Sequence, residues 1–403
     1  MKKLNNYIII LSPFILCSGP FFADLFFSYF ALVFFFLIKT EFIRSILKTL
    51  LFKGFCIFFL YIFLRSMLSD NIQLSLESSL FYSRFLFGSL SIAYYFIEKK
   101  LIKKFSISVI IVFLILFVDS YYQYFFGVNL IGFEKINENR ISSFFGTESI
   151  LGSFLSRMFF LVFLSFLTFK ISKRINSNFI LLFLIINTFV IIVLSGERTA
   201  LFLFCICIFG ISIIEKKYIY LIYSSFFISF IFVTIFSINT DRIFSETFKQ
   251  IGLNSLVNQS NLDDREIYIY SNQHQKHFIT ALNLFKEKPL FGYGPKTFRI
   301  VCKKENIDIG GCSTHPHNYS LQLLSETGIT GFVFYIVFYC FMIKEIFSNR
   351  IKNNNNIIFF KISVLGLLIN FFPLIPTGNF FGNAINTLNY IPIVFYFVYK
   401  YKK

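Results

Sequence analysis

Long runs of apolar residues alternate with short polar stretches along most of this chain. A helix needs about 20 consecutive apolar residues to cross the hydrocarbon core of a bilayer. On that scale the pattern predicts twelve membrane-spanning helices, near residues 7–20, 22–38, 49–65, 79–97, 105–126, 150–169, 178–195, 199–214, 218–238, 327–343, 357–376 and 382–399. We therefore expect an all-α polytopic integral membrane protein.

One polar segment interrupts this rhythm between the ninth and tenth predicted spans. It covers residues 239–318 and is far longer than the other loops. Loops of that length in a compact protein are usually functional. The sequence thus predicts three regions, which are nine spans in residues 1–238, one large external loop in residues 239–318, and three spans in residues 319–403.

Composition supports a membrane protein and excludes two other classes. Hydrophobic residues make up 56% of the chain and charged residues only 15%. A soluble domain carries about 25% charged residues, and a soluble core has no room for this much apolar surface. Disordered chains have the opposite signature, with low hydrophobicity and high charge.

The formal net charge of +17 follows from membrane topology. Lysine and arginine cluster at the N-terminus and after every even-numbered predicted span. Because cytoplasmic loops carry the excess of basic residues, we expect both termini to be cytoplasmic and the large loop to be external. The charge therefore gives no support for nucleic acid as a partner.

Two arginines lie within predicted spans. Arg84 and Arg157 are between one and two turns inside the external ends of their spans. An intramembrane arginine is costly and is a functional candidate by default. Asp119 lies at a similar depth in its own span, so a structural ion pair with one of these arginines is the alternative.

Further arginines lie in the predicted external loops. Arg140 and Arg198 are in short loops, and Arg265 is in the large one. The guanidinium fork binds phosphate oxygens through two parallel hydrogen bonds, so these arginines suit a lipid-linked diphosphate. The simpler alternatives are an interfacial anchor, in which Glu197 pairs with Arg198, and a surface salt bridge for Arg265.

His315 and His317 precede the tenth predicted span and are the candidates for proton transfer, because histidine exchanges protons near neutral pH. A structural role for this pair is the alternative. Cys302 and Cys312 can form a disulfide if the large loop is in an oxidising compartment. No nucleotide-binding or metal-ligand motif appears at a recognised spacing, so we expect neither a cofactor nor a metal.

The region around these histidines resembles a known family pattern. His317-Asn318 is followed after nine residues by Gly328-Ile329-Thr330-Gly331. This resembles the hallmark of the O-antigen ligase and polymerase superfamily, which is His, then Asn, Ser or Gln, nine residues, and G-x-x-G. Residues 195–199 resemble the family's S-G-x-R-T turn, and residues 286–298 resemble its N-P-L-x-G-x-G-x-x-x-F segment. The likeness covers most of residues 105–345, and it implies structural roles for Gly328 and Gly331.

The resemblance implies a membrane-embedded glycosyltransferase of the C type, without metal or cofactor. Such an enzyme takes a glycan from undecaprenyl diphosphate at the periplasmic face of the bacterial inner membrane. It implies His317 as the catalytic base, with Asn318 beside it, and Arg198 and Arg265 as ligands of the donor diphosphate. His315 lies outside the family pattern. Three arginines remain as candidates for supporting roles: Arg84, Arg140 and Arg157.

Two activities share these motifs. A ligase joins a finished polymer to a lipid A-core sugar or another glycan acceptor, whereas a polymerase joins one lipid-linked unit to another. One dominant external loop favours the ligase, because polymerases tend to carry two large loops. A secondary transporter is the alternative from another class. It predicts charged residues near mid-membrane and broken helices in repeated halves, whereas the arginines here lie toward the outside.

Overall fold

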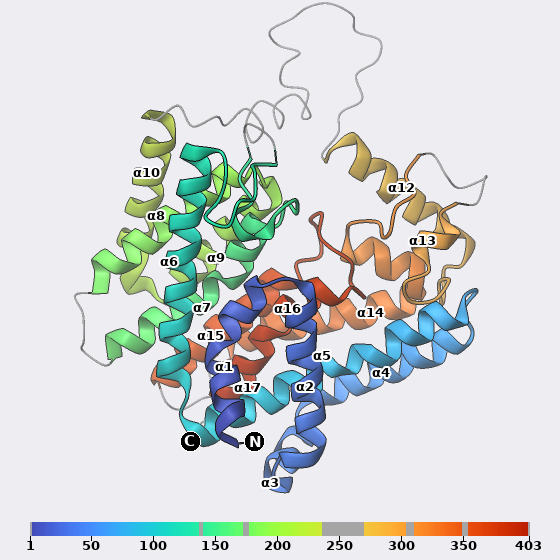
Figure 1. Ribbon diagram of the computed structural model, residues 1–403. Coiled ribbons are helices and arrows are strands. Elements are labelled where there is room, and N and C mark those ends of the chain that lie inside the picture. Colours follow the sequence, from blue (N-terminus) through green and yellow to red (C-terminus); the bar gives the residue numbers. More distant parts are fainter. Residues whose placement is uncertain are drawn as a thin grey trace, which may run out of the picture.

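The computed structural model describes residues 2–136, 140–171, 177–235, 270–303, 310–348 and 354–401. Every regular element in these ranges is a helix (Figure 1). The α-helices are α1 (Lys2–Cys17), α2 (Pro20–Leu37), α3 (Thr40–Leu47), α4 (Leu50–Met67), α5 (Ile72–Lys99), α6 (Ile102–Phe126), α7 (Leu151–Ile171), α8 (Ser177–Ser195), α9 (Arg198–Ile214), α10 (Ile219–Ile235), α12 (Asn272–Glu287), α13 (Phe298–Val301), α14 (Tyr319–Phe347), α15 (Asn354–Asn370), α16 (Asn383–Asn389) and α17 (Ile391–Tyr401). Two short 3-10 helices are η1 (Ser143–Phe145) and η2 (Lys216–Tyr218).

These helices pack into one bundle. In Figure 1, α6 to α10 form one side of the molecule, α4, α5 and α14 form the other, and α15 and α17 run between them. Helix α2 packs along α5, α15 packs along α17, and α7 contacts α6, α8 and α9. Helix α12 packs on α14, at the end of the molecule opposite α3 and the N-terminus.

The structure is consistent with an integral membrane protein, but the expected twelve spans are not confirmed. Among the described residues, five helices are long and apolar enough to cross a membrane, namely α4, α5, α7, α8 and α14. The number rises to seven if two bent helix pairs, α2 with α3 and α9 with the helix after it, each form one span.

The last two expected spans differ most from the observed helices. The span expected at 357–376 ends as a helix at Asn370, and residues 371–382 contain Pro373 and Pro376 and are not helical. Proline has no N–H to donate and disfavours helix at the residue before it, so the chain leaves the helix here. The span expected at 382–399 is divided between α16 and α17. We call residues 371–382 the connecting segment.

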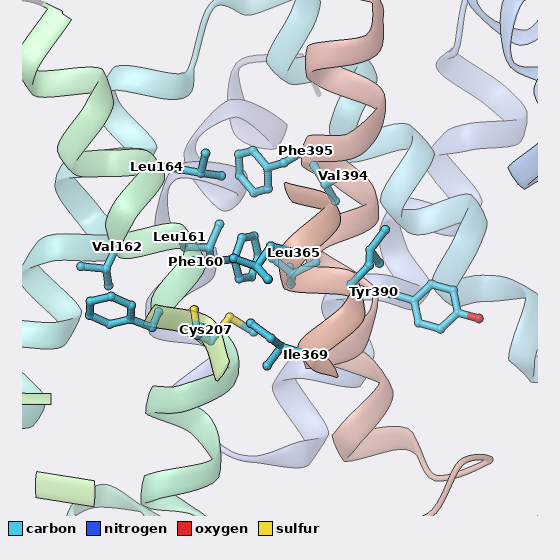
Figure 2. Packing of buried hydrophobic residues seen from close by; sticks show 14 of the residues in the cluster. Phe160, Leu161, Val162, Leu164, Cys207, Leu365, Ile369, Tyr390, Val394 and Phe395 are labelled. Atoms are coloured by element: carbon cyan, nitrogen blue, oxygen red, sulfur yellow. The ribbon is translucent and has the colours of Figure 1, made fainter. Parts of the chain in front are cut away.

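The centre of the bundle is filled with aromatic and branched apolar side chains (Figure 2). Phe160 of α7 is fully buried and packs against Leu365 of α15 and Phe395 of α17. A Cβ atom on Gly366 would lie 2.8 Å from the Phe160 ring, so glycine lets this ring approach the α15 backbone. Small residues commonly allow such close packing between membrane helices. This core joins α7 to α15 and thereby places Arg157 near the connecting segment.

Helix α14 is broken at Gly328, where φ is +65° and ψ is −171°. The break frees backbone groups on both sides, and residues 289–298, the docking segment, bind them. Four backbone hydrogen bonds join the docking segment to α14: Tyr293 N to Ser325 O (3.1 Å), Gly294 N to Glu326 O (2.7 Å), Ile329 N to Pro289 O (2.8 Å) and Thr330 N to Leu290 O (3.4 Å). Because buried backbone groups need partners, the break in α14 and the docking segment stabilise each other.

Arg65 holds the docking segment from its other side. This residue lies near the end of α4 and is only 8% exposed. Its Nε donates to the carbonyl of Phe291 (2.8 Å) and its Nη2 donates to the carbonyl of Gly292 (2.6 Å). Arg65 therefore has a structural role, which its position at the end of the predicted span 49–65 did not indicate.

We predict that Gly328→Ala releases the docking segment. The positive φ disfavours alanine, and the new Cβ would lie 2.4 Å from the Leu290 backbone, which cannot move without breaking the hydrogen bonds described above. The expected loss is about 2 kcal/mol or more in the free energy of unfolding. Thermal unfolding of the detergent-solubilised protein and protease cleavage within 289–298 measure it.

Gly54→Ala is the matched control, because Gly54 lies inside α4 and a Cβ atom added there would meet nothing within 4 Å. This variant should unfold at the wild-type temperature. Equal behaviour of the two variants would contradict a special role for Gly328.

Candidate functional site

A cavity of about 1760 Å³ lies beside the residues that precede α14. Part of its lining is apolar and comes from α1, α6 and α7, for example Phe14, Leu116 and Phe154. The polar part contains arginines and histidines from separate segments of the chain: Arg140, Arg157, Arg198, Arg299, His274, His315 and His317. The cavity therefore brings together candidates that lie far apart in the sequence.

His317 lines this cavity with its backbone in the left-handed region, at φ +54°. That conformation is uncommon for a residue other than glycine, although histidine is enriched in it. Such residues often occur at functional sites, where the surrounding structure holds them in place. Here the carbonyl of His317 accepts a hydrogen bond from the N–H of Thr377 in the connecting segment (2.8 Å).

All four histidines of the chain meet at this point. The ring centroid of His317 lies 4.0 Å from that of His315, 5.2 Å from that of His277 and 5.5 Å from that of His274. Burial, together with the neighbouring imidazoles, lowers the pKa of His317 to about 3. The ring is therefore neutral at pH 7 and able to accept a proton. Within the described ranges, no three His, Cys, Asp or Glu residues are arranged to hold a metal ion.

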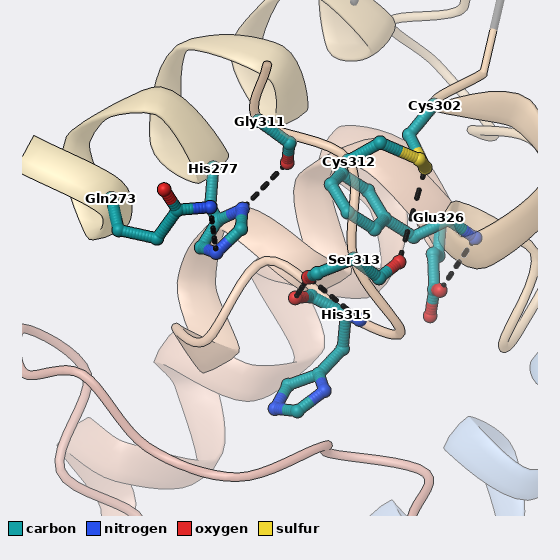
Figure 3. Close-up of a disulfide and its surroundings, with 9 residues drawn as sticks. Gln273, His277, Cys302, Gly311, Cys312, Ser313, His315 and Glu326 are labelled. Carbon is teal, nitrogen blue, oxygen red and sulfur yellow. Dashed lines mark hydrogen bonds between the residues drawn. A yellow bond between two sulfur atoms is a disulfide. The ribbon is translucent and has the colours of Figure 1, made fainter.

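The loop that carries His315 is fastened at two points (Figure 3). A disulfide joins Cys302 to Cys312, with 5.2 Å between their Cα atoms. Next to it, Nδ1 of His277 lies 2.6 Å from the carbonyl oxygen of Gly311. A carbonyl only accepts, so this nitrogen of His277 carries the proton. The ring of His315 points away from the disulfide and lines the cavity.

Asn318 connects the start of α14 to the connecting segment. Its Oδ1 accepts a hydrogen bond from the N–H of Leu321 (3.1 Å), which makes Asn318 the N-cap of the helix. Its Nδ2 donates to the carbonyls of Pro373 and Ile375, each at 3.3 Å. The Asn in the His-Asn pair thus positions the backbone that carries His317.

Arg157 binds the connecting segment from α7. The residue is 3% exposed, and its Nη1 donates to the carbonyl of Asn370 while Nη2 donates to Oγ1 of Thr377, both at 2.8 Å. Because the N–H of Thr377 also binds the carbonyl of His317, Arg157 supports the histidine indirectly.

Glu197 orders the turn before Arg198. Its two carboxylate oxygens accept hydrogen bonds from the N–H groups of Gly152 (2.7 Å) and Ser153 (2.9 Å), in the first turn of α7. Burial raises the pKa of Glu197, and these two N–H groups oppose that shift. Close by, Nε of Arg140 donates to the carbonyl of Ser195 (2.9 Å). These contacts hold Arg198, the first residue of α9, in the lining of the cavity.

The structural alternative, in which Asp119 pairs with an intramembrane arginine, is wrong. Arg84 instead binds Asp24 of α2 through Nη2 (2.6 Å) and Nε (2.8 Å) and is not part of the cavity lining. Asp119 is fully buried and accepts from the N–H of Leu130 and the hydroxyl of Ser143. Its role is to order the loop after α6. Arg265 lies outside the described residues.

Sequence motifs did not single out Arg299, which lines the cavity from α13. They also missed the connecting segment, since residues 371–376 were included in a predicted span. Arg299 does lie within the stretch from Lys276 to Lys304 that is rich in basic residues. That excess of positive charge was the available signal, but it did not distinguish Arg299 from its exposed neighbours.

Comparison with known proteins supports the resemblance. The family model for O-antigen ligase matches residues 179–336, which include Arg198, His317 and the break in α14. This match supports the O-antigen ligase and polymerase superfamily for the chain. No curated protein matches the sequence.

We predict that Asn318→Asp is more harmful than Asn318→Ser. Both variants keep an oxygen for the N-cap, but aspartate replaces the Nδ2 donor with a carboxylate oxygen that faces two carbonyls. The expected additional loss is about 1–3 kcal/mol in the free energy of unfolding. It should appear as a lower melting temperature and faster chymotrypsin cleavage within residues 371–382. Equal melting temperatures of the two variants would contradict the predicted cost of placing a carboxylate oxygen against the two carbonyls.

Proposed function

From the match to the O-antigen ligase family, we propose that this chain transfers a glycan from undecaprenyl diphosphate to a sugar hydroxyl at the periplasmic membrane face. The observation that carries the proposal is that His317 and Arg198, both within the matched segment, line one cavity. The apolar part of that lining suits a donor that remains anchored in the membrane by its polyprenyl chain.

In this proposal His317 acts as the general base. A sugar hydroxyl is a poor nucleophile until a base within hydrogen-bond reach removes its proton. The neutral imidazole takes that proton while the hydroxyl oxygen forms a bond to the anomeric carbon of the donor glycan. The bond from that carbon to the diphosphate oxygen breaks in the same step, so the configuration inverts.

Arg198 stabilises the leaving diphosphate. As the bond to carbon breaks, the electron pair moves to the diphosphate oxygen, and a preorganised cation there lowers the barrier. Arg140 lies in the same lining and adds positive charge. Arg265, which the family pattern matches, is proposed as a further ligand of this diphosphate.

We favour ligation to a lipid A-core sugar, or another glycan acceptor, over polymerisation, because the sequence predicts one dominant external loop. Deleting the gene and analysing surface lipopolysaccharide on gels tests this. Loss of O-antigen, with lipid-linked polymer accumulating, is the result expected for a ligase. Core carrying a single repeat unit would indicate a polymerase. An unchanged profile would contradict the proposal and favour a transporter or another glycan.

We predict that complementing the deletion strain with His317→Ala does not restore transfer. Loss of a general base lowers the rate by about 10²–10⁴-fold. Arg198→Lys should also fail, because lysine cannot provide two parallel hydrogen bonds to a phosphate. Arg84→Lys is the matched control, since it keeps its charge beside Asp24 and lies outside the cavity lining. Immunoblots of membranes check that all variants are present in equal amounts.

The low pKa of His317 predicts the pH profile of the reaction. The active form is the neutral imidazole, which exists above the pKa and is lost as the pH falls through it. Because burial lowers this pKa to about 3 in the free protein, kcat/KM should not fall between pH 8 and pH 5. The negative charge of a bound donor raises the pKa of a nearby imidazole, so kcat should decline at higher pH than kcat/KM. A decline of kcat/KM near pH 6.5 would contradict the assignment.

A further inference from the structure

The side-chain amide of Asn379, in the connecting segment, is fixed by groups that donate to its oxygen. Its Oδ1 accepts hydrogen bonds from the N–H of Phe381 (2.9 Å) and from Nε2 of Gln322 (2.7 Å). A backbone N–H cannot accept, so the atom that faces Phe381 must be the oxygen of the amide and not its nitrogen. The two hydrogens on Nδ2 of Asn379 are therefore left for another partner.

Gln322, which holds Asn379, is itself fixed in one orientation. This residue of α14 is fully buried, and its Oε1 accepts the N–H of Phe380 (2.8 Å). Its Nε2 must therefore be the donor, and it binds both Asn379 and Oε2 of the buried Glu326 (3.0 Å). Because every member of this network has an assigned partner, the amide of Asn379 is preorganised on the first two turns of α14.

The amide nitrogen of Asn379 is open to the cavity. Asn379 lines the cavity, and its Nδ2 makes no hydrogen bond to any residue that the structure describes. This nitrogen is not enclosed by the protein either, because it retains accessible surface. A fixed amide nitrogen with two hydrogens and an open face is a donor for a ligand.

Thr377 supplies a second uncharged donor on the same segment. Its Oγ1 accepts from Nη2 of Arg157 (2.8 Å), and since arginine only donates, the hydroxyl proton of Thr377 takes no part in this bond. Within the described ranges that proton has no acceptor, and Thr377 lines the cavity. The N–H of Thr377 binds the carbonyl of His317, so this donor lies beside the proposed base.

We infer that Thr377 and Asn379 form a sugar-binding subsite next to His317, in which their uncharged donors bind oxygen atoms of a glycan. The inference rests on the proposed function, because the glycan is either the one being transferred or the one that accepts it. Uncharged N–H and O–H groups match the uncharged oxygens of a sugar, whereas the arginines of the cavity match a phosphate. The connecting segment thus orients the sugar and leaves the diphosphate to the arginines.

Binding of ligand pairs that differ only in their sugars tests the inference without measuring transfer. One pair is undecaprenyl diphosphate with and without its glycan, and the other is lipid A with and without its core oligosaccharide. The Kd of each ligand is measured by microscale thermophoresis on the purified, detergent-solubilised protein. The Kd of the sugar-free ligand divided by that of the sugar-bearing one then isolates the contribution of the sugars.

We expect Asn379→Ser to lower this ratio about tenfold in one of the two pairs, because a hydrogen bond to the sugar is lost. Serine keeps an oxygen for the N–H of Phe381 but has no amide donor. Thr377→Val should lower the ratio in the same pair. The affected pair identifies the source of the sugar, which is the donor glycan for the undecaprenyl pair and the acceptor for the lipid A pair.

Two further variants are controls. Thr377→Ser keeps the hydroxyl and should retain the wild-type ratios. Asn187→Ser is the matched asparagine control, since Asn187 is also partly buried but lies outside the cavity lining. The Kd of undecaprenyl diphosphate without its glycan should be the same in all variants, which shows that each one is folded.

The inference would be overturned if Asn379→Ser and Thr377→Val left both ratios at their wild-type values, or if they acted on different pairs. Equal Kd values within both pairs in the wild-type protein would also overturn it, because no sugar would then be recognised. Failure of the wild-type protein to bind undecaprenyl diphosphate is a separate result, which contradicts the proposed function instead.

Discussion

The break in α14 is the constraint on which the rest of this structure depends. A helix that passes near or through a membrane cannot leave backbone carbonyl and N–H groups without partners. At Gly328 the helix does release such groups, and residues 289–298 bind them through their own backbone. Docking there fixes α13, and the disulfide between Cys302 and Cys312 ties the segment before His315 to it. The position of the histidines is therefore a consequence of hydrogen bonds made more than a helical turn away from them.

A second non-helical segment, residues 371–382, has the same need for partners and meets it with side chains. Asn318 binds two of its carbonyls, Arg157 binds Thr377, and the N–H of Thr377 binds His317. The result is a cavity in which neutral, buried imidazoles stand among arginines. Burial keeps the imidazoles unprotonated, while the arginines remain charged and give the cavity a positive potential. That combination suits a reaction in which a base removes a proton beside a departing diphosphate.

Sequence patterns predicted much of this arrangement and failed at specific residues. The apolar runs correctly placed most helices, and the His-Asn and S-G-x-R-T motifs identified two residues that line one cavity, His317 and Arg198. The pairing of Asp119 with an arginine was wrong. Two residues at the same depth in their predicted spans need not lie on neighbouring helices, and Arg84 binds Asp24 instead. The connecting segment was missed because its residues are almost as apolar as those of a span.

By itself, the sequence determined that the chain is helical and apolar, and its motifs singled out His317 and Arg198, which line one cavity. Those properties depend on residue type and spacing, which are local. Only the tertiary structure decided that four histidines from two distant segments meet, that Glu197 caps α7 rather than simply balancing Arg198, and that Arg299 enters the cavity. The physical reason is that these contacts are made between separate helices, whose relative positions follow from the packing around Phe160 and the backbone pairing at Gly328.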